Sequence, residues 1–224
     1  MRDKEKTSLR LLALQQFKDK LENQSLLPGQ FISQRELAQT LGFSLGAIRE
    51  AIPMLEAHGL ILTIPQRGLQ VFKPDINFIH NAFQLRLFLE QEALSAFMDN
   101  PNLHYIQQIK SKLETLLKAK EKAILTPEDI HEAQEIDFSF HFALIESLNN
   151  SLIQEIYNLN LLKIRLSALK ETAITDQIFQ DVVQAHIYLF SLILKRDKKS
   201  ALKALKKHLS DGKNRALGLD VSSL

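Results

Sequence analysis

Residues 32–71 read ISQRELAQTLGFSLGAIREAIPMLEAHGLILTIPQRGLQV, and this stretch decides the fold of the N-terminal part of the chain. Ser33 followed three residues later by Glu36 is a capping box, which predicts the start of a helix. Gly42 then allows a tight turn, and Ser44 is in position to cap a second helix directly afterwards. The pattern is that of a helix-turn-helix.

An apolar, β-rich run follows this second helix and predicts a hairpin. It covers residues 60–64, stops at Pro65, and resumes its alternation over residues 69–71. The hairpin makes the motif a winged helix-turn-helix, in which an exposed helix enters the major groove of DNA and the wing reaches a neighbouring groove or phosphate. Three arginines fall on the side that DNA would occupy: Arg35, Arg49 and Arg67. The alternative is a small winged domain that makes protein contacts.

Short motifs in this segment resemble the GntR family of bacterial transcription regulators. They are Pro-Gly at 28–29, Arg-Glu-Leu-Ala at 35–38, Leu-Gly at 41–42, Arg-Glu-Ala at 49–51, Gly-Leu-Ile at 59–61 and Arg-Gly at 67–68. The resemblance implies operator contacts from Arg35, Ser44, Arg49, Gln66, Arg67 and Gly68.

One position departs from the family pattern. The family usually has a basic residue directly after the serine or threonine that opens the recognition helix, whereas this chain has Leu45 followed by Gly46. Either a hydrogen bond is absent there or an apolar contact with a thymine methyl group replaces it. We include Leu45 and Gly46 with the six positions above, and we call these eight positions the reading face.

Composition bounds the class of protein. The chain has 224 residues, a formal net charge of +2 and no cysteine, so disulfides, thiolate metal sites and cysteine nucleophiles are excluded. A net charge this small provides no global basic field, and contact with nucleic acid requires a local patch. The sequence shows no stretch typical of a signal peptide or a membrane span, and we expect a soluble, cytoplasmic protein without membrane contact.

The periodicity of the chain predicts a mainly α protein. A helix is expected from a cap at Thr7 to about Asn23, before the winged segment. We expect residues 1–72 to form the winged helix-turn-helix domain, residues 73–78 a linker, and residues 79–224 an all-α helical bundle. The predicted bundle helices span residues 76–98, 102–122, 127–148, 151–171, 175–195 and 197–214.

Three of the predicted bundle helices carry metal-binding side chains among their apolar positions. Asp137 and His141 are four residues apart in the third helix and therefore share a face. His186 lies on the inward face of the fifth helix, and His208 lies on that of the sixth. A buried carboxylate requires a cation or several donors. One carboxylate and three imidazoles suit a divalent ion, best Zn²⁺ with Ni²⁺ or Mn²⁺ as alternatives; the competing interpretation is structural histidines held by hydrogen bonds.

The bundle also resembles the FCD effector domain of FadR-type GntR regulators. The resemblance rests on Asp-Phe-Ser-Phe-His at 137–141, Asn150, Ala-His at 185–186 and the last histidine, His208. It implies that Asp137, His141, His186 and His208 bind metal, and we call these four the metal cluster. It further implies a homodimer and a small organic acid bound near the metal. Candidates for holding that effector are Arg86, Asn150 and Arg165, although Arg86 could instead pair with Glu90 on a solvated face.

The sequence thus predicts a dimeric, ligand-responsive transcriptional regulator that binds double-stranded operator DNA, with repression expected over activation. It predicts no enzymatic activity. One rival is a metal sensor in which the ion itself is the signal. Another is a metallo-hydrolase with an appended winged domain, although no carboxylate is placed by a motif as general base.

Overall fold

The computed structural model describes residues 2–120, 126–168 and 176–219, and these residues divide into two compact units. Unit 1 contains the chain up to Asp75 together with the second half of α7, from Leu159 onward. Unit 2 contains Ile76–Asn158 and the helices that follow α7. The helix α7 therefore contributes residues to both units. The expected mainly α fold, with a winged helix-turn-helix before a helical bundle, is confirmed.

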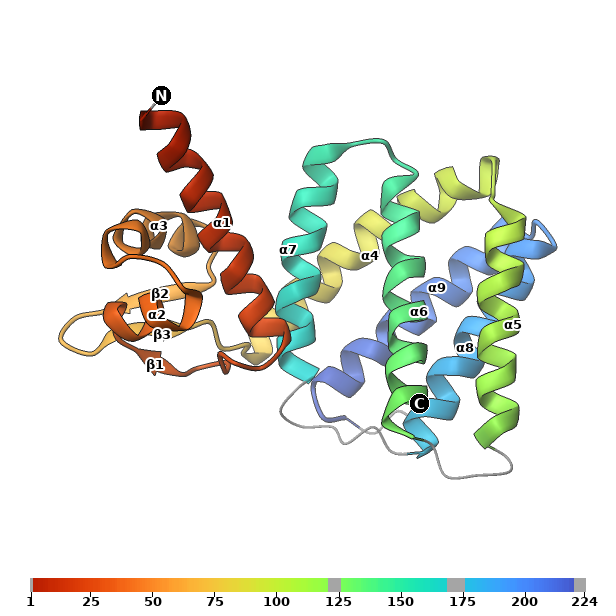
Figure 1. Cartoon of the computed structure of the whole chain (residues 1–224). Coiled ribbons are helices and arrows are strands. Elements are labelled where there is room, and N and C mark those ends of the chain that lie inside the picture. Colours follow the sequence, from red (N-terminus) through yellow and green to blue (C-terminus); the bar gives the residue numbers. More distant parts are fainter. Residues whose placement is uncertain (1, 121–125, 169–175, 220–224) are drawn as a thin grey trace. The chain divides into compact units, whose positions relative to one another are not determined.

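Unit 1 is a three-helix winged motif (Figure 1). Its elements are α1 (Arg2–Glu22), β1 (Phe31–Ile32), α2 (Gln34–Leu41), α3 (Leu45–Ala57), β2 (Ile61–Ile64) and β3 (Gly68–Val71). The predicted capping box is present, because the Ser33 side chain accepts from the backbone N–H of Glu36 while the Glu36 carboxylate accepts from that of Ser33. Gly42 ends α2 with a φ of 72°, a left-handed conformation that favours glycine.

The second helix of the motif runs through Pro53 without a break. Ser44 caps it by accepting from the backbone N–H of Ala47 at 3.2 Å, and its buried side chains are Ile48, Ala51, Ile52 and Leu55. Packing of this apolar face against α1 and α2 compensates for the one backbone hydrogen bond that proline removes.

A small antiparallel sheet completes unit 1, with strand order β1-β3-β2. The wing strands β2 and β3 pair from Ile61 opposite Val71 to Ile64 opposite Gly68, as the sequence predicts for a hairpin. The strand β1 was not predicted, because two residues are too short to show periodicity; its Ile32 lies opposite Leu69. The core beneath the sheet also includes Leu162 and Leu166 of α7.

Two predicted boundaries differ from the structure. The first helix begins at Arg2, so the prediction of a cap at Thr7 is wrong. The charged residues ahead of Thr7 extend the helix instead of preceding it. The helix α4 begins at Ile76, as predicted for the helix 76–98, and the predicted linker 73–78 therefore ends within α4.

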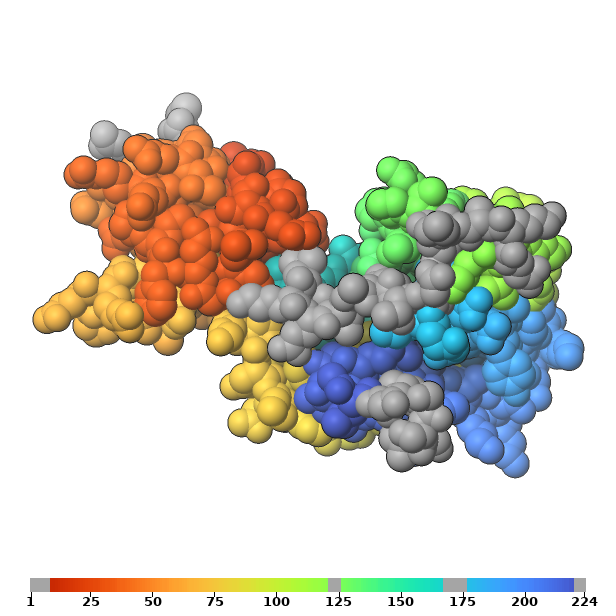
Figure 2. Space-filling model, turned by 90° about the horizontal axis from the view of Figure 1, so that it is seen from below, coloured from red at the N-terminus to blue at the C-terminus, as the bar shows by residue number. Residues whose placement is uncertain are grey.

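Unit 2 is a bundle of helices. They are α4 (Ile76–Asp99), α5 (Leu103–Lys120), α6 (Pro127–Glu146), α7 (Ser151–Ala168), α8 (Asp176–Leu194) and α9 (Lys198–Ala216). Of α7, only the part up to Asn158 belongs to this unit. All six predicted bundle helices are present; the predicted ends at residues 122, 171 and 175 lie outside the described residues. The helix α4 packs along α9 and also contacts α6, and α8 packs against α5, α6 and α9. In the space-filling view the yellow surface of α4 borders the dark blue surface of α9 (Figure 2). Among the described helices, none is both long and apolar enough to cross a membrane.

Candidate metal centre and nucleic-acid interface

The bundle brings together the four residues of the metal cluster. Asp137 and His141 come from α6, His186 from α8 and His208 from α9. One ligand atom from each lies within 4.8 Å of the other three. The three imidazoles are buried, and the side chain of Asp137 is 21% exposed. Three helices distant in sequence thus supply a compact set of one oxygen and three nitrogen atoms.

Two of the distances between the donor atoms match those around a single ion, and two are a few tenths of an ångström longer. The Oδ1 atom of Asp137 lies 2.9 Å from Nε2 of His186, 3.7 Å from Nε2 of His141 and 3.8 Å from Nε2 of His208. Nε2 of His141 and Nε2 of His208 are 3.2 Å apart. Ligands about 2.1 Å from a shared ion are separated by about 3.0 Å in octahedral and about 3.4 Å in tetrahedral geometry.

The second ring nitrogens fix the tautomers of two histidines. Nδ1 of His186 lies 2.9 Å from the carbonyl oxygen of Val182, and Nδ1 of His141 lies 2.5 Å from Oε2 of Glu90. Because these oxygens only accept, each Nδ1 carries the proton, and the neutral ring has its lone pair on Nε2. When each ring is neutral, its lone pair therefore lies on Nε2, where it can bind a cation.

Hydrogen bonding within the cluster, such as that between Nε2 of His141 and Nε2 of His208, does not satisfy every buried donor atom. Nε2 of His186 is buried and makes no hydrogen bond, although Oδ1 of Asp137 is only 2.9 Å away. A buried ring nitrogen whose lone pair has no hydrogen-bond donor is available to bind a cation. The residues therefore fit a divalent metal ion, and their nitrogen-rich donor set is the one that Zn²⁺, Ni²⁺ and Mn²⁺ accept.

The electrostatics of the cluster favour positive charge. Burial alone would raise the pKa of Asp137, but His186 and His141 outweigh it and hold this pKa well below its usual value. Burial would lower the pKa of His141, but the carboxylates of Glu90 and Asp137 raise it to about 9. For His208, burial and the two neighbouring imidazoles lower the pKa, so its ring stays neutral and able to donate a lone pair. The negative charge that attracts a proton to His141 equally attracts a metal ion.

A second buried group adjoins the metal cluster, and sequence reasoning missed most of it. It consists of Arg86 and Glu90 of α4 and Tyr157 of α7, and we call it the buried triad. Nε of Arg86 donates to Oε1 of Glu90 at 2.6 Å, and the Tyr157 hydroxyl donates to the same oxygen at 2.9 Å. Burial would raise the pKa of Glu90, but Arg86 and His141 outweigh it and lower the pKa to about 2. Glu90 is therefore a buried carboxylate anion.

The three predicted effector ligands lie in different settings. Arg86 forms the predicted pair with Glu90, but the pair is buried and not on a solvated face. Asn150 is exposed, and its side-chain oxygen accepts from the backbone N–H groups of Leu152 and Ile153 at the start of α7. Arg165 belongs to unit 1 and lies 3.6 Å from a carboxylate oxygen of Glu22. Direct contact of these residues with an effector stays a prediction.

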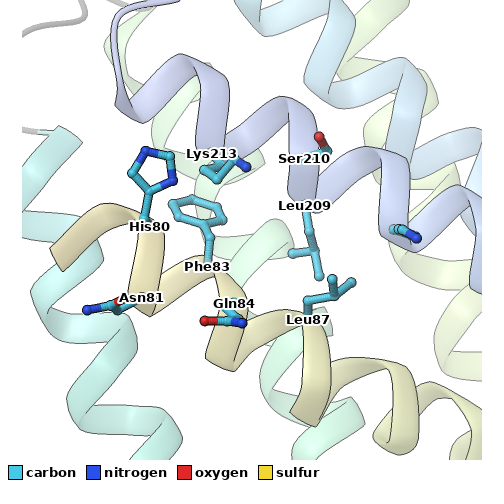
Figure 3. A pocket seen from close by; sticks show the side chains of 9 residues that line it. His80, Asn81, Phe83, Gln84, Leu87, Leu209, Ser210 and Lys213 are labelled. Carbon is cyan, nitrogen blue, oxygen red and sulfur yellow. The ribbon is translucent and has the colours of Figure 1, made fainter. Parts of the chain in front are cut away.

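An open groove of about 410 Å³ runs between α4 and α9 on the surface of unit 2 (Figure 3). Its lining includes the apolar side chains of Phe83, Leu87 and Leu209 together with Lys206 and Lys213. None of its lining residues belongs to the metal cluster or the buried triad. The groove is therefore distinct from the place where the buried donors converge.

The reading face lies in unit 1, on α2, α3 and the wing. Its arginines are exposed, as are Ser44, Gly46 and Gln66, while Leu45 and Gly68 are half-buried. Nε of Arg49 donates to the side chain of Gln34 at 3.1 Å, a bond that links the start of α2 to α3. The Ser44 hydroxyl caps α3 in the free protein by accepting from a backbone N–H group of that helix. α3 is the helix that we expect to contact DNA.

The wing tip has a defined conformation. The backbone N–H of Arg67 donates to the carbonyl of Ile64, and Gln66 has a φ of 62°. The guanidinium of Arg67 lies 4.7 Å from the ring centroid of Phe31, within cation–π range. A Cβ at Gly68 would approach the carbonyl oxygen of Ile32 to 3.0 Å, so a glycine is required where the wing meets β1.

Family comparison decides between the alternatives for this architecture. Residues 12–71 match "Bacterial regulatory proteins, gntR family", and residues 81–211 match "FCD domain". The chain belongs to the GntR family and carries an FCD domain. This GntR regulator is a DNA-binding transcriptional regulator and not an enzyme, so the metallo-hydrolase alternative is set aside.

Individual relatives agree with this family. The HTH-type transcriptional regulator YdhC of Bacillus subtilis (strain 168) is 26% identical over 196 residues, which cover 87% of this chain and 85% of YdhC. Among solved structures, E. coli McbR/YncC superposes with a TM-score of 0.72 at 20% identity, over 94% of this chain and 97% of that one. The metal-free FCD domain of TM0439 gives a TM-score of 0.53 at 20% identity, over 65% of this chain and 95% of that domain. These two structures support the fold.

Proposed function

We propose that this GntR regulator binds a two-fold operator as a cytoplasmic homodimer and that its FCD domain controls this binding through a divalent metal ion and a small organic acid. The observation that carries the proposal is the convergence of one carboxylate oxygen and three imidazole nitrogens from three helices within 4.8 Å. Repression is the expected outcome, because an operator-bound dimer excludes other proteins from the same DNA.

Support for operator contact comes from the reading face. Exposed arginines on α2, α3 and the wing provide donors for guanine edges and phosphates. A single motif of this size makes few base contacts, and a two-fold arrangement doubles them. Leu45 at the start of α3 adds an apolar group of the kind that contacts a thymine methyl.

Support for metal binding comes from the chemistry of the cluster. Asp137, His141, His186 and His208 would hold the ion, which would neutralise Asp137 and leave room for a water or an effector carboxylate. One structural relative, the FCD domain of TM0439, was solved in a metal-free form. For this chain we infer an ion that can be bound and released.

The signal carried by the metal site has two candidate forms. Nη2 of Arg86 is buried without a hydrogen bond, which supports a nearby organic acid as the signal. However, Nε of the same guanidinium is already engaged by Glu90, which favours the alternative of a sensor in which the ion itself is the signal. Both forms use the same metal cluster.

One experiment tests the proposal directly. Elemental analysis and native mass spectrometry of the purified full chain should report a dimer with about one metal ion per chain. Operator DNA selected from a random pool then allows anisotropy titrations with metal, with chelator, and with metal plus a panel of organic acids. A chain that neither retains nor takes up Zn²⁺, Ni²⁺ or Mn²⁺ would contradict the metal role. An operator affinity that responds to metal alone would favour the sensor.

A further inference from the structure

The buried triad contacts the metal cluster at the Nδ1 atom of His141. This nitrogen lies 2.5 Å from Oε2 of Glu90, and both side chains are fully buried. A ring whose Nδ1–H faces a carboxylate is fixed in tautomer and rotation, and its Nε2 becomes the more basic ligand. The other oxygen of the same carboxylate has two donors of its own.

The two donors hold Glu90 in place. Nε of Arg86 and the hydroxyl of Tyr157 both donate to Oε1, at 2.6 and 2.9 Å. Since Oε1 is bound from two directions, the carboxylate cannot rotate, and Oε2 stays directed at His141. Arg86 also balances the charge of Glu90, which would otherwise be an uncompensated buried anion.

We propose that Glu90 is the positioning residue of the metal site: its carboxylate holds His141 with Nε2 turned toward the ion, and Tyr157 ties that carboxylate to α7. This inference rests on the proposed metal-dependent function and deepens it, because it assigns residues that transmit metal occupancy. Neither residue is part of the predicted ligand set.

The position of Tyr157 in α7 suggests how metal binding at His141 could affect the DNA-reading unit. Tyr157 lies in the part of α7 that belongs to unit 2, whereas Leu162 and Leu166 of the same helix belong to the core of unit 1. A change at His141 is communicated through Glu90 to a helix that the DNA-reading unit also uses. This connection requires that Oε2 of Glu90 contacts His141 while Oε1 accepts from Tyr157.

The first test measures zinc affinity of the full chain by competition with a chromophoric chelator. Glu90→Gln should bind zinc about 10 to 100 times more weakly than the wild type. Glu92→Gln, on an exposed position of the same helix, is the matched control and should leave the affinity unchanged. Should Glu90→Gln fail to fold beside the charged Arg86, Glu90→Asp keeps the negative charge but withdraws the carboxylate from Nδ1, and a clear loss is again expected.

A double-variant cycle separates positioning from general damage to the core. If Glu90 acts through His141, adding Glu90→Gln to His141→Ala should change the residual zinc affinity by less than about twofold, since the ring that Glu90 orients is gone. Nitrogen NMR of the His141 ring should also show Nδ1 protonated in the wild type and a mixture of tautomers in Glu90→Gln. Wild-type zinc affinity in both Glu90 variants, or an undiminished effect in the His141→Ala background, would overturn the assignment.

The second test addresses α7. Tyr157→Phe removes one hydroxyl and should leave zinc affinity within about threefold while reducing the zinc-induced change in operator affinity, compared with Tyr188→Phe at an exposed position of α8. A full zinc response in Tyr157→Phe would overturn the link to α7. These outcomes differ from failure of the proposed function, in which the wild type itself would bind no metal.

Discussion

At the scale of single residues, Arg49 is the position on which operator binding should depend most. It is exposed on α3, and its bond to Gln34 restricts the guanidinium before DNA arrives. Arg49→Ala should weaken operator binding by about 1 to 3 kcal/mol, as expected for loss of a contact to a base edge. Fluorescence anisotropy with the selected operator measures the change.

The control for Arg49 is another exposed basic residue, outside the reading unit. Lys112→Ala, on α5, removes the same charge and should leave operator affinity nearly unchanged. Equal affinities for the Arg49 and Lys112 variants would remove Arg49 from the reading face.

Single residues also show where sequence reasoning stops. The four metal-cluster residues were predicted because polar side chains interrupted apolar faces, and the fold does bring them together. The sequence indicates Glu90 only as a surface partner of Arg86, because an arginine and a glutamate four residues apart are typical of a solvated helix face. The sequence gives no indication of a role for Tyr157, since a tyrosine at an apolar position of a helix is interpreted as a core residue. Only the packing of α4 against α6 reveals that Glu90 faces His141.

At the scale of elements, helix ends follow local chemistry. Ser33 caps α2 through a complete capping box, and loss of its hydroxyl leaves backbone N–H groups without their acceptor. Ser33→Ala should therefore lower the free energy of unfolding of unit 1 by about 1 kcal/mol. Urea denaturation followed by circular dichroism is the measurement. Ser25→Ala, in the turn after α1, is the control and should be nearly neutral; an equally stable Ser33 variant would contradict the role of the cap.

The elements themselves could be predicted well from the sequence, because caps, turns and periodicity are local signals. Thr126 with Pro127, like Ser33 and Gly42, marks an end that the structure reproduces. Failures occurred where the signal is absent or nonlocal. The strand β1 exists only because Ile32 pairs with β3. The helix α1 begins before Thr7, the predicted cap, because no residue there requires the helix to begin at that position.

At the scale of the whole molecule, metal should contribute to stability as well as to signalling. A ligand present at one hundred times its Kd stabilises the folded state by about 2.7 kcal/mol, which corresponds to a rise of about 5 to 11 °C in Tm for a domain of this size. Adding a chelator should therefore lower the Tm of unit 2 by about this amount. Differential scanning calorimetry follows the transition.

The variant that tests this shift is His186→Ala, which removes one ligand of the cluster. Its Tm should respond far less to metal and chelator than that of the wild type. His131→Ala, at an exposed position of α6, keeps the cluster and should retain the full shift. If His186→Ala also kept the full shift, the ion would be bound elsewhere.

The division of α7 between the two units has a practical consequence for dissecting this regulator. Truncation after Asp75 would keep every residue of the reading face but remove Leu162 and Leu166 from the core beneath it. The truncated fragment would expose the apolar surface that those leucines cover, and we expect it to self-associate or to require detergent. A stable minimal DNA-binding fragment would have to include this part of α7 as a fused segment. The first unit is completed by a segment that is synthesised much later than the rest of it.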